Sequence, residues 1–246
     1  MVETMPVSIS GQVAVIVGAS SGIGRAAAVL FVREGANVVA AARREDRLNS
    51  LKDELATEQR KITVRRADAS NVEDMQQLAQ ETLKQFGKVD ILVVASGINT
   101  PDRSMKRLTP EIWNSLVDVN LNGAFYATHA FLPSMRNAGS GHLIYISSIS
   151  GVMADVSGAA YQASKRGVVG LAHAIRMEEK QNGIRTCVIC PGLVNTELLE
   201  KRPVKPSPEE LAKALQAEDV AETIVHVAKL PTRASIPELI LLPATQ

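Results

Sequence analysis

The most constraining part of this sequence is residues 13–24, where an apolar run leads into a glycine-rich turn. Val13-Ala-Val-Ile-Val17 is typical of a buried strand, Gly18-Ala-Ser-Ser-Gly-Ile-Gly24 of a tight turn, and residues 25–31 of a helix. Glycine accepts positive φ and has no Cβ, so the backbone can approach a ligand closely, and the first N–H groups of a helix favour an anion. The stretch therefore predicts a phosphate-binding turn. Its spacing, Gly-x-x-x-Gly-x-Gly, differs from the commoner Gly-x-Gly-x-x-Gly pattern, so the rest of the chain must identify the ligand.

The charge balance excludes several classes of partner. The chain of 246 residues has 27 Lys plus Arg against 26 Asp plus Glu, a net charge of +1. Such a chain has no strong field to attract nucleic acid or an anionic membrane, so we expect a small-molecule ligand. The first ten residues lack the pattern of a signal peptide, and no run of 18 apolar residues occurs, which predicts a cytoplasmic protein without a membrane segment.

Apolar strand patterns alternate with helical patterns along the whole chain. Strands are expected at residues 13–17, 37–41, 62–65, 89–94, 143–146, 184–189 and 239–242. Helices are expected at residues 25–31, 45–59, 70–86, from 109 past 135, 161–180 and 219–229, with capping boxes at Ser70–Glu73 and Ser207–Glu210 and a stop at Gly87. This alternation predicts a single α/β domain over residues 1–246, with a doubly wound parallel sheet of about seven strands and helices on both faces.

The two cysteines, Cys187 and Cys190, fall within one predicted strand. Residues three apart on a strand point to opposite faces, which argues against a local disulfide or a shared metal. We expect two buried free thiols, with a redox Cys-x-x-Cys as the alternative. The four histidines are scattered without metal-ligand spacing, so no metal site is predicted.

The second strand ends in Ala41-Ala42-Arg43-Arg44. A protein that binds NAD usually has an acid at this position, where it contacts the ribose 2′-hydroxyl. Two arginines favour a 2′-phosphate instead, because a guanidinium pairs well with phosphate, although they could also be an ordinary solvated helix start. Given the glycine turn one strand earlier, we predict NADP(H) rather than NAD, with Arg43 as the principal contact.

Tyr161 and Lys165 are four residues apart on a predicted helix and therefore share one face. A free tyrosine has a pKa of about 10, and a nearby ammonium lowers that pKa by stabilising the phenolate. Such a pair is common on amphipathic helices, so a third group is needed to indicate chemistry. Ser148 is that group, because it follows a predicted strand at the edge where ligands bind in α/β sheets.

Six motifs in order resemble those of the short-chain dehydrogenase/reductase family and span nearly the whole chain. They are the glycine turn, Asp68 after the third strand, Val119-Asn120-Leu121-Asn122-Gly123, Ile146-Ser147-Ser148, Tyr161-Gln162-Ala163-Ser164-Lys165 and Pro191-Gly192-Leu193-Val194-Asn195-Thr196. The resemblance implies a Rossmann-type fold and hydride transfer between a nicotinamide and a carbonyl or alcohol carbon. Ser148 stands thirteen residues before Tyr161, the usual family interval, with Ser147 as the fallback.

The resemblance also implies a role for each member of a catalytic set, Asn120, Ser148, Tyr161 and Lys165. Ser148 would hydrogen-bond the substrate oxygen, and Tyr161 would donate the proton to it. Lys165 would hold the nicotinamide ribose and lower the tyrosine pKa, while Asn120 would anchor a water linking Lys165 to solvent. The loop from Pro191 would fix the nicotinamide, and Asp68 would touch the adenine or serve only as a cap. The full predicted cofactor set is Gly18, Ser20, Ser21, Gly22, Ile23, Gly24, Arg43, Arg44, Asp68, Ala69, Gly97, Tyr161, Lys165, Pro191, Gly192, Val194 and Thr196.

One motif departs from the family, because Val94-Ala95-Ser96-Gly97 stands where Asn-Asn-Ala-Gly is usual. We expect Ser96 to supply part of the missing hydrogen bonding. The substrate would contact the loop after Gly97 and a short segment around residues 194–215. These regions contain Ile98, Asn99, Leu198 and Leu199, together with Met153, with Arg103, Lys201 and Arg202 nearby, a set that selects no single substrate.

The resemblance implies an NADP(H)-dependent oxidoreductase that interconverts a carbonyl and a secondary alcohol. It also implies a homo-oligomer, either tetramer or dimer, because relatives commonly assemble in this way. The alternatives are an NAD-dependent alcohol or steroid-type dehydrogenase and a non-catalytic dinucleotide sensor on the same fold. The complete set of Asn120, Ser148, Tyr161 and Lys165 argues against the sensor.

Overall fold

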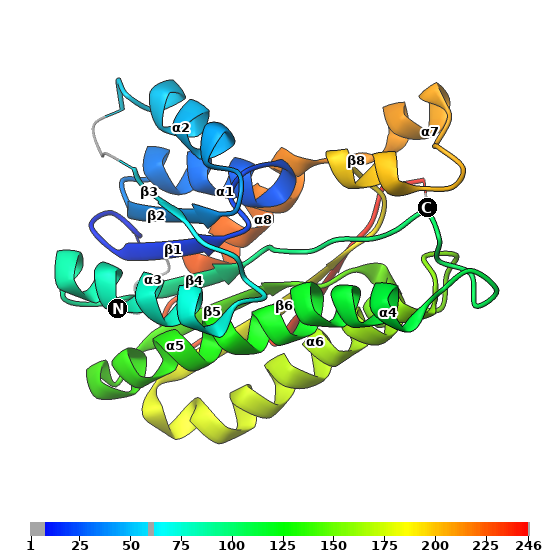
Figure 1. Ribbon diagram of the computed structural model, residues 1–246. Helices are drawn as coiled ribbons and strands as arrows, with labels where there is room; N and C mark the ends of the chain where they lie inside the picture. The colour runs from blue at the N-terminus through cyan, green and yellow to red at the C-terminus, as the bar shows by residue number, and fades with distance from the viewer. Residues whose placement is uncertain (1–7, 59–61, 246) are drawn as a thin grey trace.

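The computed structural model, which describes residues 8–58 and 62–245, contains a seven-stranded parallel sheet (Figure 1). The strands lie in the order β3-β2-β1-β4-β5-β6-β9, and every neighbouring pair is parallel. Their bounds are β1 Val13–Val17, β2 Asn37–Ala42, β3 Thr63–Arg66, β4 Ile91–Val94, β5 Gly141–Ile146, β6 Ile184–Pro191 and β9 Glu238–Leu241. The order reverses between β1 and β4, so the predicted doubly wound sheet is confirmed and its ligand crevice is expected above these two strands.

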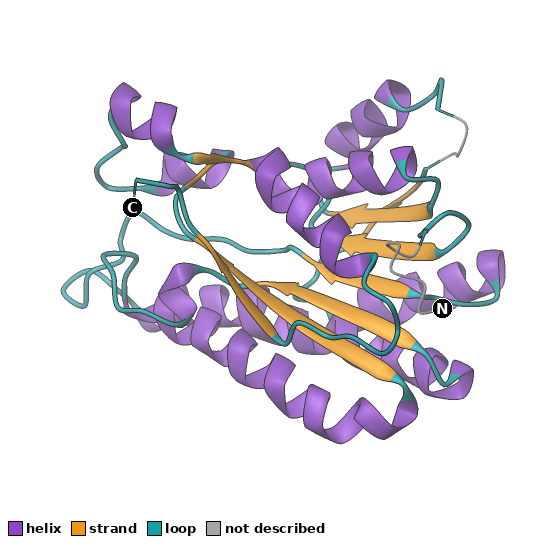
Figure 2. Cartoon of the chain, turned by 180° about the vertical axis from the view of Figure 1, so that it is seen from behind, coloured by secondary structure: helices purple, strands orange, loops and turns teal. Residues whose placement is uncertain are grey.

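Helices cover both faces of the sheet, as Figures 1 and 2 show. One core joins the sheet to α1, α2 and α8, and a second core joins the opposite face to α3, α5 and α6. The helices are α1 Gly22–Arg33, α2 Glu45–Glu54, α3 Val72–Phe86, α4 Pro110–Val117, α5 Gly123–Ala138, α6 Ala159–Glu179, α7 Pro208–Lys213 and α8 Ala217–Ala228. Among the described residues, no helix is both long and apolar enough to cross a membrane.

The strands are apolar without alternation because both of their faces are buried. Along β1, Ala14 and Ile16 enter the core beneath α1, whereas Val15 and Val17 enter the core beneath α5. The same geometry separates the two cysteines: Cys187 lies in the first core and Cys190 in the second, and both are free and buried. The prediction that they point to opposite faces is confirmed.

The predicted helix ends agree with the structure at two places and are wrong at a third. Gly87 ends α3 with a φ of 75°, and Ser207 opens α7 in a capping box with Glu210, as predicted. The capping box predicted at Ser70 is wrong, because Asn71 is the N-cap and its side chain accepts the backbone N–H of Asp74 at 2.8 Å. The Ser70 hydroxyl instead donates to Asp68, which closes the preceding turn.

Other differences concern segments with weak periodic patterns. The helix predicted over residues 45–59 ends at Glu54, and residue 59 lies outside the described residues. The long helix predicted from residue 109 is interrupted by a π-helical segment, Asp118–Asn122, between α4 and α5. Two strands of two residues each were not predicted: β7 Val194–Asn195 pairs in parallel with β8 Leu215–Gln216. Strands this short leave no alternating pattern in a sequence.

Candidate active site

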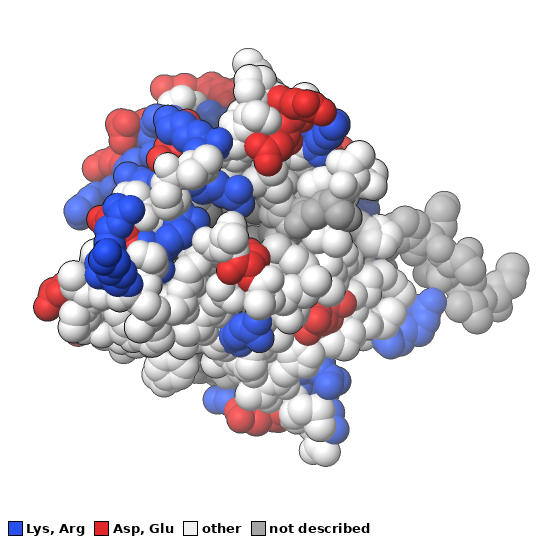
Figure 3. All heavy atoms as spheres, turned by 90° about the vertical axis from the view of Figure 1, so that its right-hand side faces the viewer, with Lys and Arg blue, Asp and Glu red and all other residues white. Residues whose placement is uncertain are grey.

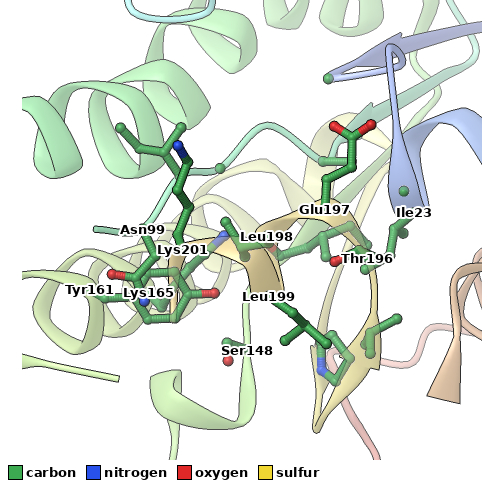
Figure 4. Close-up of a pocket in the computed structure, with 18 of the residues that line it drawn as sticks. Ile23, Asn99, Ser148, Tyr161, Lys165, Thr196, Glu197, Leu198, Leu199 and Lys201 are labelled. Carbon is green, nitrogen blue, oxygen red and sulfur yellow. Dashed lines mark hydrogen bonds between the residues drawn. The ribbon is translucent and has the colours of Figure 1, made fainter. Parts of the chain in front are cut away.

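A single pocket of about 820 Å³ lies at the carboxyl ends of the strands, close to the size expected for a ligand site. Every predicted cofactor residue lines it, as do Ser148, Tyr161 and Lys165 from the predicted catalytic set. Asn120 is buried behind the wall rather than lining it. Figure 4 shows Ser148, Tyr161 and Lys165 at one end of the pocket, with Ile23 and Thr196 at the other. One cavity therefore joins the glycine turn to the residues predicted to react.

The glycine turn is built around close backbone contacts. Gly18 has a φ of 93°, and a Cβ there would lie 2.6 Å from the backbone nitrogen of Ser96. A Cβ on Gly24 would lie 2.3 Å from the carbonyl oxygen of Gly18. The N-cap Ser21 makes no side-chain cap, and the first turn of α1 carries no acidic residue. The positive end of this helix therefore faces the pocket without an acidic residue of its own first turn.

Tyr161 lies in the first turns of α6 and is 7% exposed. Burial raises its pKa to about 12, and a hydrogen bond with Ser148 partly opposes that rise. The sequence predicted a lowered pKa for Tyr161, whereas burial raises it, and a contribution of Lys165 to lowering that pKa stays a prediction. The Lys165 ammonium lies 5.9 Å from the centre of the tyrosine ring and donates to the carbonyl oxygen of Ile146 at 2.9 Å. The positive charges that lower the Tyr161 pKa are those of Arg103 and Arg202.

Lys165 itself is almost fully buried, and burial lowers its pKa to about 8. A lysine with such a pKa loses its charge near the upper end of the physiological pH range. Its ammonium lies close to Gly97, where a Cβ would approach the Lys165 Nζ to 3.2 Å. The glycine retained in the Val94–Gly97 motif therefore leaves room for the lysine.

The two adjacent serines face different partners. The Ser147 hydroxyl donates to the backbone carbonyl of Lys165 at 2.8 Å and so ties the end of β5 to α6. The Ser148 hydroxyl, in contrast, is the one that hydrogen-bonds Tyr161. This geometry favours Ser148 over the fallback Ser147 as the residue that meets a substrate oxygen.

The carboxylate of Asp155, which the sequence analysis did not single out, ends a chain of hydrogen bonds that begins at Ser148. Ser148 donates to the Ser150 hydroxyl at 3.2 Å, and Ser150 donates to Asp155 at 2.6 Å. The hydroxyl and backbone N–H of Ser157 also donate to Asp155, at 3.0 and 2.9 Å. The negative charge of Asp155 raises the pKa of Tyr161. Loop residues of this kind carry no periodic pattern, so only the Ser148 end of the network could be predicted.

Asn120 lies in the π-helical segment and joins two parts of the site. Its Oδ1 accepts the backbone N–H of Ile98 at 2.7 Å, and its Nδ2 donates to the Ile98 carbonyl and to the Ser164 hydroxyl, each at 3.0 Å. Asn120 thereby holds the loop after β4 against α6. Its predicted role in a water relay stays a prediction.

The two predicted arginines have different surroundings. Arg43 lies 3.8 Å from Asp68, and both side chains are partly exposed. Arg44 lies over the glycine turn, where it donates to Ser21 at 2.6 Å and to Ser20 at 3.2 Å. Its guanidinium also pairs with Glu197 at 2.8 Å, and Arg47 pairs with the same carboxylate at 3.2 Å. Of the two predicted phosphate contacts, Arg44 is therefore the one that touches the glycine turn. The sequence did not reveal that Glu197 and Arg47 belong to the same group of charged side chains.

Two further predictions concern Asp68 and Ser96. The Asp68 side chain accepts from the backbone N–H and the hydroxyl of Ser70, at 3.0 and 2.8 Å, so it closes the turn before α3, whereas the cap of that helix is Asn71. The predicted contact of Asp68 with the adenine stays a prediction. We expected Ser96 to replace part of the family's missing hydrogen bonding, which is wrong. Its hydroxyl oxygen is buried without a hydrogen-bond partner in the described part of the chain.

The comparisons with known proteins agree with this site. The family described as short chain dehydrogenase matches residues 12–206. The chain belongs to this family. An uncharacterized oxidoreductase of Staphylococcus saprophyticus is 31% identical to it over 97% of this chain and 98% of its own length. The chain is thus a member of the short-chain dehydrogenase family, related over 97% of its length to a protein named as an oxidoreductase.

Solved structures of short-chain dehydrogenases show the same fold. The alcohol dehydrogenase of the archaeon Thermococcus sibiricus, complexed with 5-hydroxy-NADP, superimposes with a TM-score of 0.87 and 28% identity, over 96% of this chain and 98% of that chain. A metagenomic short-chain oxidoreductase in complex with NADP has a TM-score of 0.84 and 30% identity, over 97% and 100% of the two chains.

The residues of this short-chain dehydrogenase fit a nicotinamide dinucleotide. The glycine turn packs backbone against backbone at Gly18 and Gly24, where a Cβ would collide, and this packing leaves the uncapped start of α1 facing the pocket. Ser96 also lines the pocket, and its backbone lies against Gly18, while its hydroxyl oxygen is buried without a partner among the described residues. A helix start with unpaired N–H groups that faces a pocket suits an anionic group, which the phosphates of a dinucleotide would supply.

Proposed function

We propose that this protein is an NADP(H)-dependent oxidoreductase that interconverts a carbonyl and a secondary alcohol. The observation that carries the proposal is the meeting of Ser148, Tyr161 and Lys165 with the glycine turn in one pocket. Each group taken alone has a structural explanation. Their convergence at the ligand edge of a doubly wound sheet is best explained by catalysis.

The proposed reaction gives each side chain a distinct task. When bound, the nicotinamide supplies or accepts the hydride. Ser148 holds the substrate oxygen, and Tyr161 donates its proton to that oxygen as negative charge develops there. Because burial raises the pKa of Tyr161 to about 12, the phenol is protonated at neutral pH and is ready to act as the acid in reduction. Oxidation requires the phenolate, and positive charge near the hydroxyl favours that form.

Lys165 and Asn120 would support the tyrosine. The buried Lys165 ammonium lies 5.9 Å from the centre of the Tyr161 ring, and we propose that it would hold the hydroxyls of the nicotinamide ribose. Gly97 lies close to both supporting side chains, since a Cβ there would be 3.2 Å from Lys165 Nζ and 3.6 Å from Asn120 Oδ1. We propose that a water beside Gly97, between Lys165 and Asn120, resupplies the proton of Tyr161 through Lys165.

The preference for NADP(H) rests on Arg44, with Arg43 as a second contact. A guanidinium fixed over the start of α1 by Ser20 and Ser21 suits a phosphate on the adenosine ribose. No acidic residue follows β2 to accept a ribose 2′-hydroxyl, since positions 43 and 44 are both arginine. Both solved relatives described above were crystallised with NADP or its derivative, which supports the same choice.

We further propose a homo-oligomer assembled through α4, α5 and α6. These helices expose large apolar side chains outside the pocket, namely Trp113, Phe125 and Met177. A second copy of the chain would bury them. The molar mass in solution, measured by light scattering, tests this proposal, and a monomer at micromolar concentration would contradict it.

The enzymatic proposal is tested by a screen of aldehydes and ketones with NADPH and with NADH, followed by alcohols in the oxidative direction. We expect reduction with NADPH at a higher kcat/KM than with NADH. A protein that binds NADPH tightly but reduces no compound in a broad panel would instead be a dinucleotide sensor. Equal kcat/KM values with the two cofactors would remove the NADP preference while leaving the reaction intact.

A further inference from the structure

Three cationic side chains line the part of the pocket that contains Tyr161. Arg103 comes from the loop after β4, whereas Lys201 and Arg202 come from the end of the 3₁₀ helix Glu197–Lys201. Figure 3 shows Lys and Arg side chains gathered beside a hollow on the face where the sheet's carboxyl ends open. The region around the reacting groups is therefore positively charged on one side.

Arg103 is held in place by its neighbours. Its Nε donates to the carbonyl of Thr100 at 3.0 Å, and one terminal nitrogen donates to the carbonyl of Lys201 at 2.8 Å. Its backbone packs on Gly158, where a Cβ would lie 2.6 Å from the Arg103 carbonyl oxygen. Gly158 is the N-cap of α6, the helix that carries Tyr161. The guanidinium is thus fixed relative to the tyrosine hydroxyl.

These cations have no carboxylate partners of their own. None of the ion pairs formed within residues 8–58 and 62–245 includes Arg103, Lys201 or Arg202. The two nearby acids form no ion pair with them: Asp155 accepts from serine hydroxyls and raises the pKa of Arg103, and Glu210 accepts in the cap of α7, while the charge of Arg202 also lowers the pKa of Glu210. The positive charge in this part of the pocket is therefore available to a ligand.

The two arginines also act on each other and on Tyr161. Burial lowers the pKa of Arg103, and the charge of Arg202 lowers it further, while Asp155 and Tyr161 oppose this effect. Both arginines lower the pKa of Tyr161, which requires that they lie close to the phenol. Like charges that face one cavity are stabilised by an anion placed between them.

We propose that the substrate carries an anionic group, a carboxylate or a phosphate, bound by Arg103 and Arg202 while its carbonyl or hydroxyl faces Ser148 and Tyr161. Lys201 lies at the same part of the wall and adds to the attraction. A guanidinium binds either group through paired N–H donors, so carboxylate and phosphate share the recognition chemistry. This inference rests on the proposed oxidoreductase function and specifies its substrate class.

The test compares matched substrates that differ in charge. The pairs are two ketones that would each give a secondary alcohol: 4-oxopentanoate with its methyl ester, and dihydroxyacetone phosphate with dihydroxyacetone. Any other carboxylate-bearing carbonyl compound reduced in the screen is also tested as its methyl ester. We expect the anionic member of a pair to have the higher kcat/KM with NADPH, by at least about tenfold. Preference for the carboxylate or for the phosphate member identifies which anion the pocket accepts.

Arg202→Gln is the more informative variant, because Arg202 forms none of the side-chain hydrogen bonds found within the described residues, whereas Arg103 supports two backbone carbonyls. We expect Arg202→Gln to lower the ratio of kcat/KM for the anionic member of a pair to that for the neutral member by about 10- to 100-fold, whatever its effect on Tyr161 does to both members alike. Arg103→Lys keeps the positive charge but loses the paired N–H donors of the guanidinium, so it is expected to retain part of the preference for anionic substrates. Arg233→Gln removes one exposed charge away from the pocket and serves as the control.

Three outcomes decide the inference. The dissociation constant of NADPH should be unchanged in Arg202→Gln, and a loss of cofactor affinity would assign this charge to the cofactor instead. Equal kcat/KM for charged and neutral partners, or an equal loss for both in Arg202→Gln, would overturn the anionic substrate and leave the oxidoreductase intact. A failure to reduce every compound in the screen despite NADPH binding would overturn the proposed function and this inference together.

Discussion

The two ends of the pocket contain arginines in opposite electrostatic states. At the glycine turn, Arg44 is paired with Glu197 and hydrogen-bonded to two serines. Near Tyr161, Arg103 and Arg202 face the cavity without an ion-pair partner among the described residues. An anion that binds Arg44 at the glycine turn must compete with Glu197. An anion near Tyr161 meets Arg103 and Arg202, which form no ion pair within the described residues. With the proposed cofactor at the first end and the proposed substrate at the second, Glu197 would compete with a phosphate of the cofactor, whereas no ion-paired carboxylate would compete with the anionic group of the substrate.

The largest expected effect comes from removing the proposed proton donor at the second end of the pocket. Tyr161→Phe deletes the proposed proton donor, and general acid catalysis contributes on the order of 10³-fold. We expect kcat for carbonyl reduction to fall by about that factor while the dissociation constant of NADPH stays the same. Full activity in this variant, measured by NADPH oxidation, would show that Tyr161 is not the acid.

A smaller but still large effect is expected at the glycine turn. Gly24→Ala places a Cβ against the Gly18 carbonyl, so the turn must shift and its N–H groups lose their alignment. We expect NADPH affinity to fall about tenfold or more, since several hydrogen bonds to charged phosphate are weakened together.

Gly170→Ala is the matched control, because Gly170 lies in α6 with open space around it. It should leave NADPH affinity unchanged and raise the free energy of unfolding by about 0.5–1 kcal/mol. Calorimetric titration with NADPH and thermal unfolding of both variants separate these effects. Unchanged NADPH affinity in Gly24→Ala would contradict the proposed phosphate cradle.

The smallest effect tests the competition at Glu197. Arg44 and Arg47 lower the pKa of Glu197, which is therefore a carboxylate at neutral pH and competes with a phosphate for Arg44. Glu197→Gln removes the competing charge. Because exposed ion pairs contribute little, we expect NADPH to bind only about two- to fivefold more tightly. NADH, which lacks the 2′-phosphate, should bind as before, and tighter binding of both cofactors would place the effect elsewhere.

Much of the fold and the central chemistry could be predicted because local patterns encode them. Strands buried on both faces appear as short apolar runs, and Tyr161 and Lys165 share a face through helical spacing alone. The glycine turn is encoded within seven consecutive residues, 18–24. These features depend on neighbours in the sequence, and the structure reproduces their geometry.

The remaining features depend on contacts that no local pattern records. Arg44 meets Glu197 across a separation of 153 residues, so the pairing could not be read from either segment. The chain from Ser148 to Asp155 runs through a loop without periodicity. The tyrosine pKa was predicted in the wrong direction because burial, a property of the folded chain, outweighs the nearby positive charges.

The most direct test of the difference between the two ends is a titration of the wild type, Arg44→Gln and Arg202→Gln with NADPH and NADH. The dissociation constants can be followed by nucleotide fluorescence. We predict that Arg44→Gln weakens NADPH by about 10- to 100-fold and NADH by less than about twofold, whereas Arg202→Gln changes neither. Equal weakening of both cofactors by Arg44→Gln, or weakening of NADPH by Arg202→Gln, would contradict the assignment of the two arginine sites to cofactor and substrate.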